Sequence, residues 1–341
     1  SYGNSGIARF GEGGAKGSIN FDAGRGHAFK IGVGYEWRPP MANTAFIAPE
    51  ICNDYVSNLK DEHVFSSEFS YQFQNSWLHA NLNAYYSRLD HVTEWQCFYN
   101  DDENSFTYVS MTGLKKEYYG VEAGLDFKLT SWLNFKTIGS ICEAKNLNNV
   151  TAVYMLSKSA DVYSDKAYVA GMRESGTPLT VGSLGLNFHK SGWFIDLNAN
   201  YYDRIYLSYS PSYRYERVLK NRQSVHITYP EIFDAVVSED GNSFLPEATE
   251  QTKGHGGWMV DMSIGKSVRL KKGSLNFNLM ITDLLNNQTM VTGGYEQNSR
   301  SGYTLTTTGE VNNARIYQFS KNPKKYYAFG TNGMFQVSYR F

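Results

Sequence analysis

Hydrophobic and polar residues alternate with a period of two along most of this 341-residue chain. In one segment, the apolar positions alternate with Lys, Gly, Glu and Arg: Phe29, Ile31, Val33, Tyr35 and Trp37. Successive side chains of a β-strand point to opposite faces of a sheet, so this pattern predicts strands with one apolar and one polar face. The same alternation recurs in further segments: 65–73, 78–86, 119–129, 193–202, 258–264, 275–281 and 335–341.

The predicted strands are roughly 10 to 16 residues long, whereas strands of soluble sheets usually have five or six residues. Such strands can cross a bilayer while tilted. Pairs of tyrosines also fall near the predicted strand ends, where membrane barrels carry aromatic girdles: Tyr85-Tyr86, Tyr118-Tyr119, Tyr201-Tyr202 and Tyr326-Tyr327. The chain is therefore expected to be all-β, as a transmembrane antiparallel β-barrel. The alternative is a soluble β-sandwich that acts as a binding module.

The connections between the predicted strands alternate between short turns and long polar segments. The short turns fall at 24–26, 74–76, 130–131, 190–192 and 271–273. The long segments fall at 39–60, 147–176, 210–254 and 284–330, with a shorter one near 100–105. Outer-membrane barrels have short periplasmic turns and longer extracellular loops. Residues 1–341 are therefore expected to form one barrel domain, without a linker between modules.

The pattern yields eleven strands, the first of them short, at 17–23. If the last strand descends to the periplasm, the first must descend from the extracellular side, although bacterial single-chain barrels normally have an even number of strands. Either a strand is missed within 1–16, or the chain begins in the middle of a larger barrel. The glycine-rich segment 1–16 resembles the end of a surface loop, which favours the second explanation. Two sheet edges would then need pairing by another segment.

The composition excludes several other classes. A formal net charge of −1 gives no electrostatic footprint for nucleic acid. With 41% hydrophobic, 15% aromatic and 19% charged residues, the chain does not resemble a disordered protein. No apolar run approaches 18 residues, so no transmembrane helix is expected. The first residues lack the features of a signal peptide, which indicates a mature protein or a fragment.

Several segments resemble TonB-dependent receptors of the outer membrane. The end of the chain resembles the recognition signal of outer-membrane barrels, and the expected signal residues alternate along it: Phe335, Val337, Tyr339 and Phe341. The segments 35–40, 45–49, 59–62 and 281–287 are similar to recurring stretches of that family. The segments 292–298 and 322–328 resemble its Bacteroidetes members. The resemblance covers nearly the whole chain, but only the C-terminal portion of the family's barrel.

This resemblance implies a 22-stranded barrel closed by an N-terminal plug, which imports a scarce extracellular ligand with energy from TonB. Eleven strands would be half of that barrel, and the plug, the TonB-binding segment and the first strands are not in this sequence. The implied location is the outer membrane of a Gram-negative bacterium. The implied partners are the TonB complex through the absent plug region, the barrel-assembly machinery, the remaining barrel and plug segment and the lipid membrane. A surface lipoprotein is a further candidate partner, and nucleic acid is not one.

Two other functions stay open at this point. A passive porin-like or structural barrel of 12 or 14 strands would need a strand that the pattern does not reveal. An outer-membrane hydrolase would need a nucleophile beside a base, and the histidines show no spacing that suggests a Ser–His pair: His79, His91, His189 and His255. No phosphate-binding glycine loop is present either. We therefore expect no enzyme activity and no cofactor.

The remaining acidic residues and the cysteines could serve in metal binding or in a disulfide. Asp101, Asp102 and Glu103 form a weak candidate for Ca²⁺, but they lack the spaced ligands of a full calcium loop. They are expected to be a solvated loop tip, and no metal is predicted. The three cysteines, Cys52, Cys97 and Cys142, are expected to be unpaired. A bridge between the first two is the alternative.

Two clusters are the best candidates for ligand contact. The first, an aromatic and basic cluster, follows the strand at 193–202: Arg204, Tyr206, Tyr209, Tyr213 and Arg214, with Tyr215 and Arg217 beside them. The second is aromatic and lies on an acidic loop: Trp95, Phe98 and Tyr99. Aromatic rings stack on sugars and heterocycles, and Arg binds anionic groups. Girdle formation and loop packing are the alternative roles for these side chains.

Overall fold

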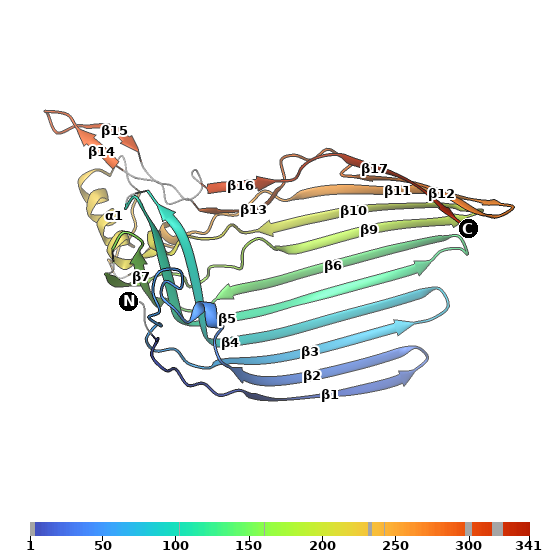
Figure 1. The fold of residues 1–341 in the computed structure, drawn as a ribbon, viewed down its shortest axis with the longest axis horizontal. Helices are drawn as coiled ribbons and strands as arrows, with labels where there is room; N and C mark the ends of the chain where they lie inside the picture. Colours follow the sequence, from blue (N-terminus) through green and yellow to red (C-terminus); the bar gives the residue numbers. More distant parts are fainter. Residues whose placement is uncertain are drawn as a thin grey trace.

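The structure, a computed structural model, describes residues 4–101, 103–159, 161–230, 234–241, 243–296, 302–315 and 323–341. Its main feature is a long, curved antiparallel sheet (Figure 1). The sheet runs through eleven strands in this spatial order: β1 (Gly13–Gly24), β2 (His27–Arg38), β3 (Glu62–Gln74), β4 (Leu78–Asn100), β5 (Ser105–Lys128), β6 (Leu133–Asn146), β9 (Pro178–Lys190), β10 (Trp193–Ile205), β11 (Gly257–Leu270), β12 (Gly273–Thr282) and β17 (Asn332–Arg340). The all-β antiparallel architecture expected from the alternation is confirmed.

The turns β1–β2, β3–β4, β5–β6, β9–β10 and β11–β12 lie at one end of the sheet, and the long connections and the tip of the β4–β5 hairpin lie at the other (Figure 1). We call these the turn end and the loop end. The first turn, between β1 and β2, contains Arg25 and Gly26, both with positive φ. A Cβ on Gly26 would lie 1.9 Å from the backbone oxygen of Gln74, so this close approach of two turns requires glycine. The predicted turns and loops are therefore in the expected places.

The two faces of the sheet differ in polarity. Large apolar side chains on the convex face are exposed, among them Ile19, Ile31, Val121 and Phe335. The concave face instead carries polar side chains that form hydrogen bonds with one another: Asn187–Asp196, Ser183–Asn200, Asn200–Asp261 and Ser263–Asn278. An apolar outer surface and a polar interior are the arrangement of a transmembrane barrel wall. None of the helices in the described ranges is long and apolar enough to cross a membrane.

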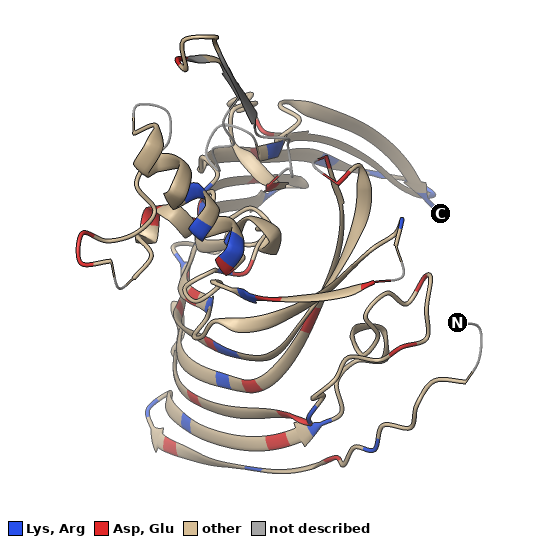
Figure 2. Cartoon of the chain, turned by 90° about the vertical axis from the view of Figure 1, so that its left-hand side faces the viewer, with Lys and Arg blue, Asp and Glu red and all other residues tan. Residues whose placement is uncertain are grey.

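The sheet is an open arc rather than a closed ring. Viewed from the loop end, its strands curve around one side of a space and leave the other side open (Figure 2). Within the described part of the chain, β1 pairs only with β2, and β17 pairs only with β12. Both outer edges thus present backbone N–H and C=O groups without a neighbouring strand.

The loop end contains structure that the alternation does not predict. Strands β4 and β5 are longer than expected, and β7 (Val150–Leu156) and β8 (Val162–Ala167) extend their outer part into a small sheet. The long loops also contain these elements: η1 (Ala42–Thr44), η2 (Pro211–Arg214), α1 (Glu216–Thr228), η3 (Pro246–Thr249), β13 (Val291–Glu296), β14 (Gly302–Leu305), β15 (Val311–Arg315) and β16 (Pro323–Tyr327). The main apolar core lies here, around Met111, Leu114, Val169 and Tyr215.

The predicted positions of three tyrosine pairs need correction. Tyr86 and Tyr119 face each other directly across β4 and β5, but both strands continue beyond them instead of ending there. The register of this strand pair shifts between Leu89 and Glu94, so the outer part of the hairpin departs from the barrel wall. These tyrosines can mark a membrane boundary but not a strand end. Tyr326 and Tyr327 lie in β16, outside the main sheet.

Candidate ligand-binding site

A charged cluster lies on the concave face at the loop end. Its centre is Lys116 on β5, whose ammonium donates a hydrogen bond to Glu174 Oε1 (2.6 Å) and forms a second ion pair with Glu94 on β4. Tyr118 Oη donates to the same oxygen of Glu174 (2.7 Å). The Lys116 side chain is buried, so both carboxylates share one cation that is shielded from water.

Strand alternation directs these side chains inward. Tyr119 and Val121 are exposed on the convex face, so Lys116 and Tyr118 on the same strand point to the concave face. Glu174 lies in the segment between β8 and β9, and its N–H donates to the backbone oxygen of Ala144 on β6 (3.0 Å). Ala144 is the partner of Tyr118 in the register of β5 and β6. The segment therefore acts as an added strand that brings Glu174 to the inner wall.

Tyr209, which follows β10, completes the cluster. Its hydroxyl accepts a hydrogen bond from Asn146 Nδ2 (3.1 Å) and donates one to Glu94 Oε2 (3.4 Å). Burial raises the pKa of the Tyr209 phenol, and the nearby Glu94 carboxylate raises it further, so the hydroxyl remains a donor. Burial alone would raise the pKa of Glu174, but the Lys116 charge and the hydrogen bonds from Lys116 and Tyr118 lower it below its ordinary value.

The cluster borders a cavity of about 280 Å³. Its lining comes from β4, β5, β6 and the loop segments around them: Thr44, Thr93, Glu94, Trp95, Gln96, Lys116, Asn146, Arg173, Glu174, Ser175, Ser208 and Tyr209. Two predicted ligand residues, Trp95 and Tyr209, thus meet at one cavity. The indole N–H of Trp95 donates to the backbone oxygen of Ile47 (3.0 Å), which fixes the ring against the loop 39–61.

The other predicted aromatic residues of β4 lie farther along the hairpin. Phe98 packs against the main apolar core. Tyr99 is exposed, and its hydroxyl donates to Asn104 Oδ1 (2.5 Å) at the hairpin tip. Neither residue lines the cavity that Trp95 borders. The structure therefore does not bring the second predicted cluster together.

Arg214, a predicted ligand residue, is enclosed inside the loops. Its guanidinium is completely buried and donates to both carboxylate oxygens of Glu296 on β13 (2.6 and 2.9 Å). It also donates to backbone oxygens of Ser210, Thr249 and Glu250, and its charge lies 5.5 Å from the ring centre of Tyr209. These contacts give Arg214 a loop-anchoring position. Tyr213 precedes it in η2.

Arg204 and Tyr206 lie on the opposite face from Tyr209. Arg204 Nη2 donates to Glu143 Oε2 (2.5 Å), and Glu143 is the register partner of the outward-facing Tyr119. The Tyr206 ring lies 4.8 Å from the guanidinium carbon of Arg173. The first predicted cluster is therefore divided among the inner cavity, the loop interior and the outer face.

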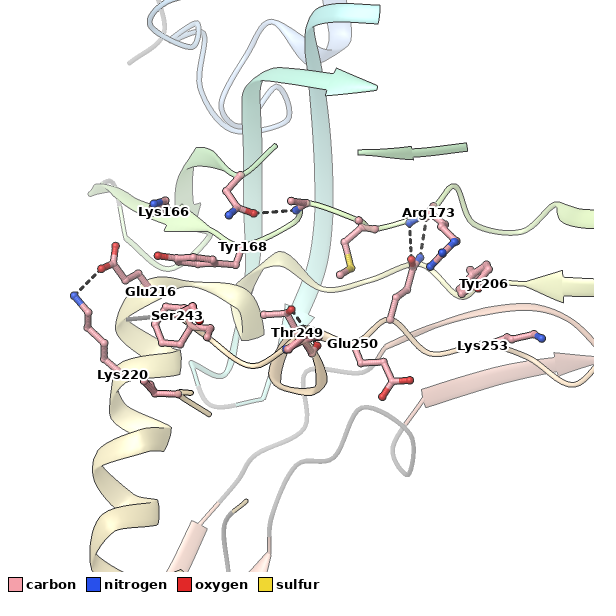
Figure 3. Close-up of a pocket in the computed structure, with 18 of the residues that line it drawn as sticks. Lys166, Tyr168, Arg173, Tyr206, Glu216, Lys220, Ser243, Thr249, Glu250 and Lys253 are labelled. Atoms are coloured by element: carbon pink, nitrogen blue, oxygen red, sulfur yellow. Dashed lines mark hydrogen bonds and ion pairs between the residues drawn. The ribbon is translucent and has the colours of Figure 1, made fainter. Parts of the chain in front are cut away.

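A larger cavity of about 1020 Å³ lies among the same loops (Figure 3). Lys166, Tyr168, Glu216 and Lys220 border one side of it. Arg173, Tyr206 and Lys253 border the other side. The Lys220 ammonium pairs with the Glu216 carboxylate (2.6 Å) one turn earlier in α1.

Sequence reasoning did not identify Lys116, Asn146 and Glu174 as candidate site residues. A usable signal exists for Lys116, because it occupies a polar position of an alternating strand just before a tyrosine pair. Glu174 has no such signal, since its segment does not alternate.

The remaining predictions concern the assembly signal, the calcium candidate and the cysteines. Phe335, Val337, Tyr339 and Phe341 are all exposed at the end of the chain, and the first three alternate along β17. In the calcium candidate, Glu103 pairs with Lys158, and Asp102 lies outside the described residues. No group of three metal-binding side chains occurs in the parts that the structure describes. Cys52, Cys97 and Cys142 are free thiols.

The fold and the two-faced sheet define an outer-membrane β-barrel protein. The family model "TonB dependent receptor-like, beta-barrel" matches residues 15–314, and the chain belongs to this family. Its place is accordingly the outer membrane of a Gram-negative bacterium. A comparison with curated protein sequences gave no match.

Solved structures with a similar fold include three outer-membrane proteins. The copper transporter OprC is 12% identical, with a TM-score of 0.54 over 97% of this chain and 40% of its own. The outer membrane transporter YddB from Escherichia coli is 10% identical, with a TM-score of 0.54 over 95% and 40%. The siderophore receptor PiuA from Acinetobacter baumannii is 11% identical, with a TM-score of 0.53 over 95% and 35%. The chain thus spans well under half of each of these proteins, and these identities support a shared fold alone.

Proposed function

We propose that residues 1–341 form the C-terminal half of the 22-stranded barrel of an outer-membrane transporter, which imports a scarce extracellular ligand with energy from TonB. The observation that carries this proposal is the open sheet of eleven strands, whose two edges have no pairing strand among the described residues. An open edge is not stable in lipid, so other strands must complete the wall. The family membership and the 35–40% of each similar chain that the sequence spans support the same proposal.

In this proposal, the missing part of the protein supplies the other strands, a plug inside the lumen and the segment that contacts TonB. A lumen enclosed by a barrel of this size is wide enough to need such a plug. The barrel-assembly machinery would read the alternating residues of β17. The segments 292–298 and 322–328 support a Bacteroidetes-type receptor, for which a surface lipoprotein would be a further partner.

The inner cavity at the loop end would contact the ligand before import. Trp95 offers an aromatic ring. Hydrogen-bond donors and acceptors come from Glu94, Lys116, Asn146 and Tyr209. This mixture suits a polar ligand with several donors and acceptors rather than an apolar one. The work of the protein is then binding and passage, with no covalent chemistry and no cofactor.

Electrical conductance of the complete protein in planar bilayers tests the proposal. A plugged transporter should show almost no open-channel conductance in KCl, whereas a passive porin should show large, stable steps. Nutrient uptake by cells that express the complete protein should also disappear when TonB is deleted. Stable open channels, together with uptake that is independent of TonB, would exclude active import.

A further inference from the structure

A row of charged side chains follows the convex face of the sheet just beyond the aromatic residues at the loop end. On β5 and β6, Glu117 is the register partner of Lys145, and their charged groups are 3.1 Å apart. The Lys145 ammonium lies 5.9 Å from the ring centre of Tyr119, which is exposed on the convex face. The row therefore begins on the side of the sheet that faces lipid.

Glu143 continues the row toward the following strands. Arg173 Nε donates to Glu143 Oε1 (2.6 Å), and Arg204 Nη2 donates to Glu143 Oε2 (2.5 Å). Arg173 is brought to this face because its segment pairs with Lys145 across an isolated bridge. Farther along, Lys253 pairs with Asp203 (3.3 Å).

The acids lie deeper than the bases in this row. The side chain of Glu143 is 14% exposed, whereas Arg173 and Lys253 are 33% and 45% exposed. Among the described residues, Nε is the only nitrogen of the Arg173 guanidinium that donates a hydrogen bond to an acceptor. An anion that approaches from outside therefore meets N–H donors first, with the carboxylates behind them.

The larger cavity opens beside this row and adds further donors. Arg173, Tyr206 and Lys253 belong to its wall, and Lys166 and Lys220 lie across it (Figure 3). Its volume of about 1020 Å³ can hold several sugar or phosphate groups. Two acidic side chains, Glu216 and Glu250, also border it, so its surface combines cations, aromatic rings and a few acceptors.

The height of the cavity in the membrane determines what it can meet. Tyr201 and Trp258 pair directly on the convex face, and Trp258 is exposed, as expected for a girdle at the membrane boundary. Asp203, Tyr206 and Lys253 follow immediately on the loop side. Lipid headgroups lie at this level, and basic pockets there attract phosphorylated headgroups.

We propose that this outward-facing cavity, with the charged row below it, binds the phosphorylated sugar headgroup of a glycolipid of the outer leaflet. Arg173 and Lys253 would contact phosphate, because guanidinium and ammonium groups form strong hydrogen bonds with phosphate oxygens. Tyr168 and Tyr206 would pack against sugar rings. The site differs from the inner cavity, although Arg173 borders both cavities, and it would not need the imported ligand.

Lipid binding to the complete protein tests this proposal, with lipopolysaccharide as the probe. The double variant Arg173→Gln, Lys253→Gln should weaken binding of lipopolysaccharide in detergent by at least about tenfold, since each surface cation contributes roughly 1 kcal/mol. Lys266→Gln is the matched control: its ammonium also lies over an aromatic ring, Trp193 at 4.8 Å, but at the turn end. Native mass spectrometry would count the bound lipid.

The proposal expects loss with the double variant, no loss with Lys266→Gln and no competition by inorganic phosphate at millimolar concentration. Equal binding by all three proteins would overturn it. Equal retention of phosphatidylglycerol would also overturn it, because simple anion attraction would then suffice. If the double variant does not fold, Lys253→Gln alone decides the question, since this side chain is the most exposed of the row.

Discussion

The inner cluster and the outer charged row are built from alternate residues of the same segments. Lys116 points inward and Glu117 outward on β5, and Glu174 points inward while its neighbour Arg173 points outward. Inside, one buried cation lies between two carboxylates. Outside, two cations cover one carboxylate. The period of two thus places opposite charge arrangements on the two faces of one wall.

The ion pair Arg214–Glu296 is completely buried among the loops above the inner cluster. Breaking it should lower the stability of the protein more than any of the changes described below. Arg214→Met leaves Glu296 buried without a cation, which costs about 3–5 kcal/mol. Hydrogen exchange of the loops 206–256 and 283–296 should become much faster, while exchange in β2 and β3 stays unchanged. Unchanged protection of both loops would contradict the anchoring role.

Lys116→Met should have the next largest effect, because it leaves Glu94 and Glu174 facing each other without their shared cation. We expect loss of about 3 kcal/mol of local stability, seen as faster exchange of the Glu174 N–H. Lys128→Met, on the same strand and face but at the turn end, is the control. Similar effects of both variants would show that the cluster has no special role.

Strong acid should destabilise the inner cluster, whereas mildly acidic pH should leave it unchanged. The pKa of Glu174 is lowered from 4.5, so its contribution to stability is fully present above about 4.5 and is lost as the pH falls through the lowered value. Exchange of the segment 171–175 should be constant between pH 7 and 5, after correction for intrinsic rates, and should rise below pH 4. Glu174→Gln should remove this dependence, and a rise already at pH 6 would argue against the assignment.

Changes in the outer row should affect stability least. Arg173 is partly solvated, and exposed ion pairs contribute about 0–1 kcal/mol. Arg173→Gln should therefore lower the thermal unfolding temperature of the complete protein only slightly, although it removes a cation from the proposed lipid site. A destabilisation as large as that of Lys116→Met would show that the two faces do not differ as described.

The alternation predicted the strands of the barrel wall because lipid outside and water inside impose opposite polarity on successive residues. It did not predict α1, β7 or β8, since these elements pack against a local core in the loops and obey no membrane period. The full length of β4 and β5 was not predicted either. Register shifts near Val92 interrupt the alternation, so the pattern placed the ends of the two strands at their tyrosines.

The candidate site could be predicted only in part. Trp95 and Tyr209 were recognised as aromatic residues beside polar ones, and both reach the inner cavity. Arg214 was expected to contact a ligand. Its burial could not be predicted, because it depends on Glu296, which lies 82 residues away in the sequence and which no local pattern connects to Arg214. Arg173 and Glu174 lie in a connecting segment, and their opposite directions follow only from its pairing with β6.

The strand neighbours of β1 and β17 in the complete protein test the central claim most directly. A structure of the full-length protein extracted from outer membranes, determined by electron cryomicroscopy, would show them. The proposal predicts that β1 and β17 each pair with a strand from outside residues 1–341, within one barrel that encloses a plug. Direct hydrogen bonding of β1 to β17, which would close a small barrel from this chain alone, would contradict it.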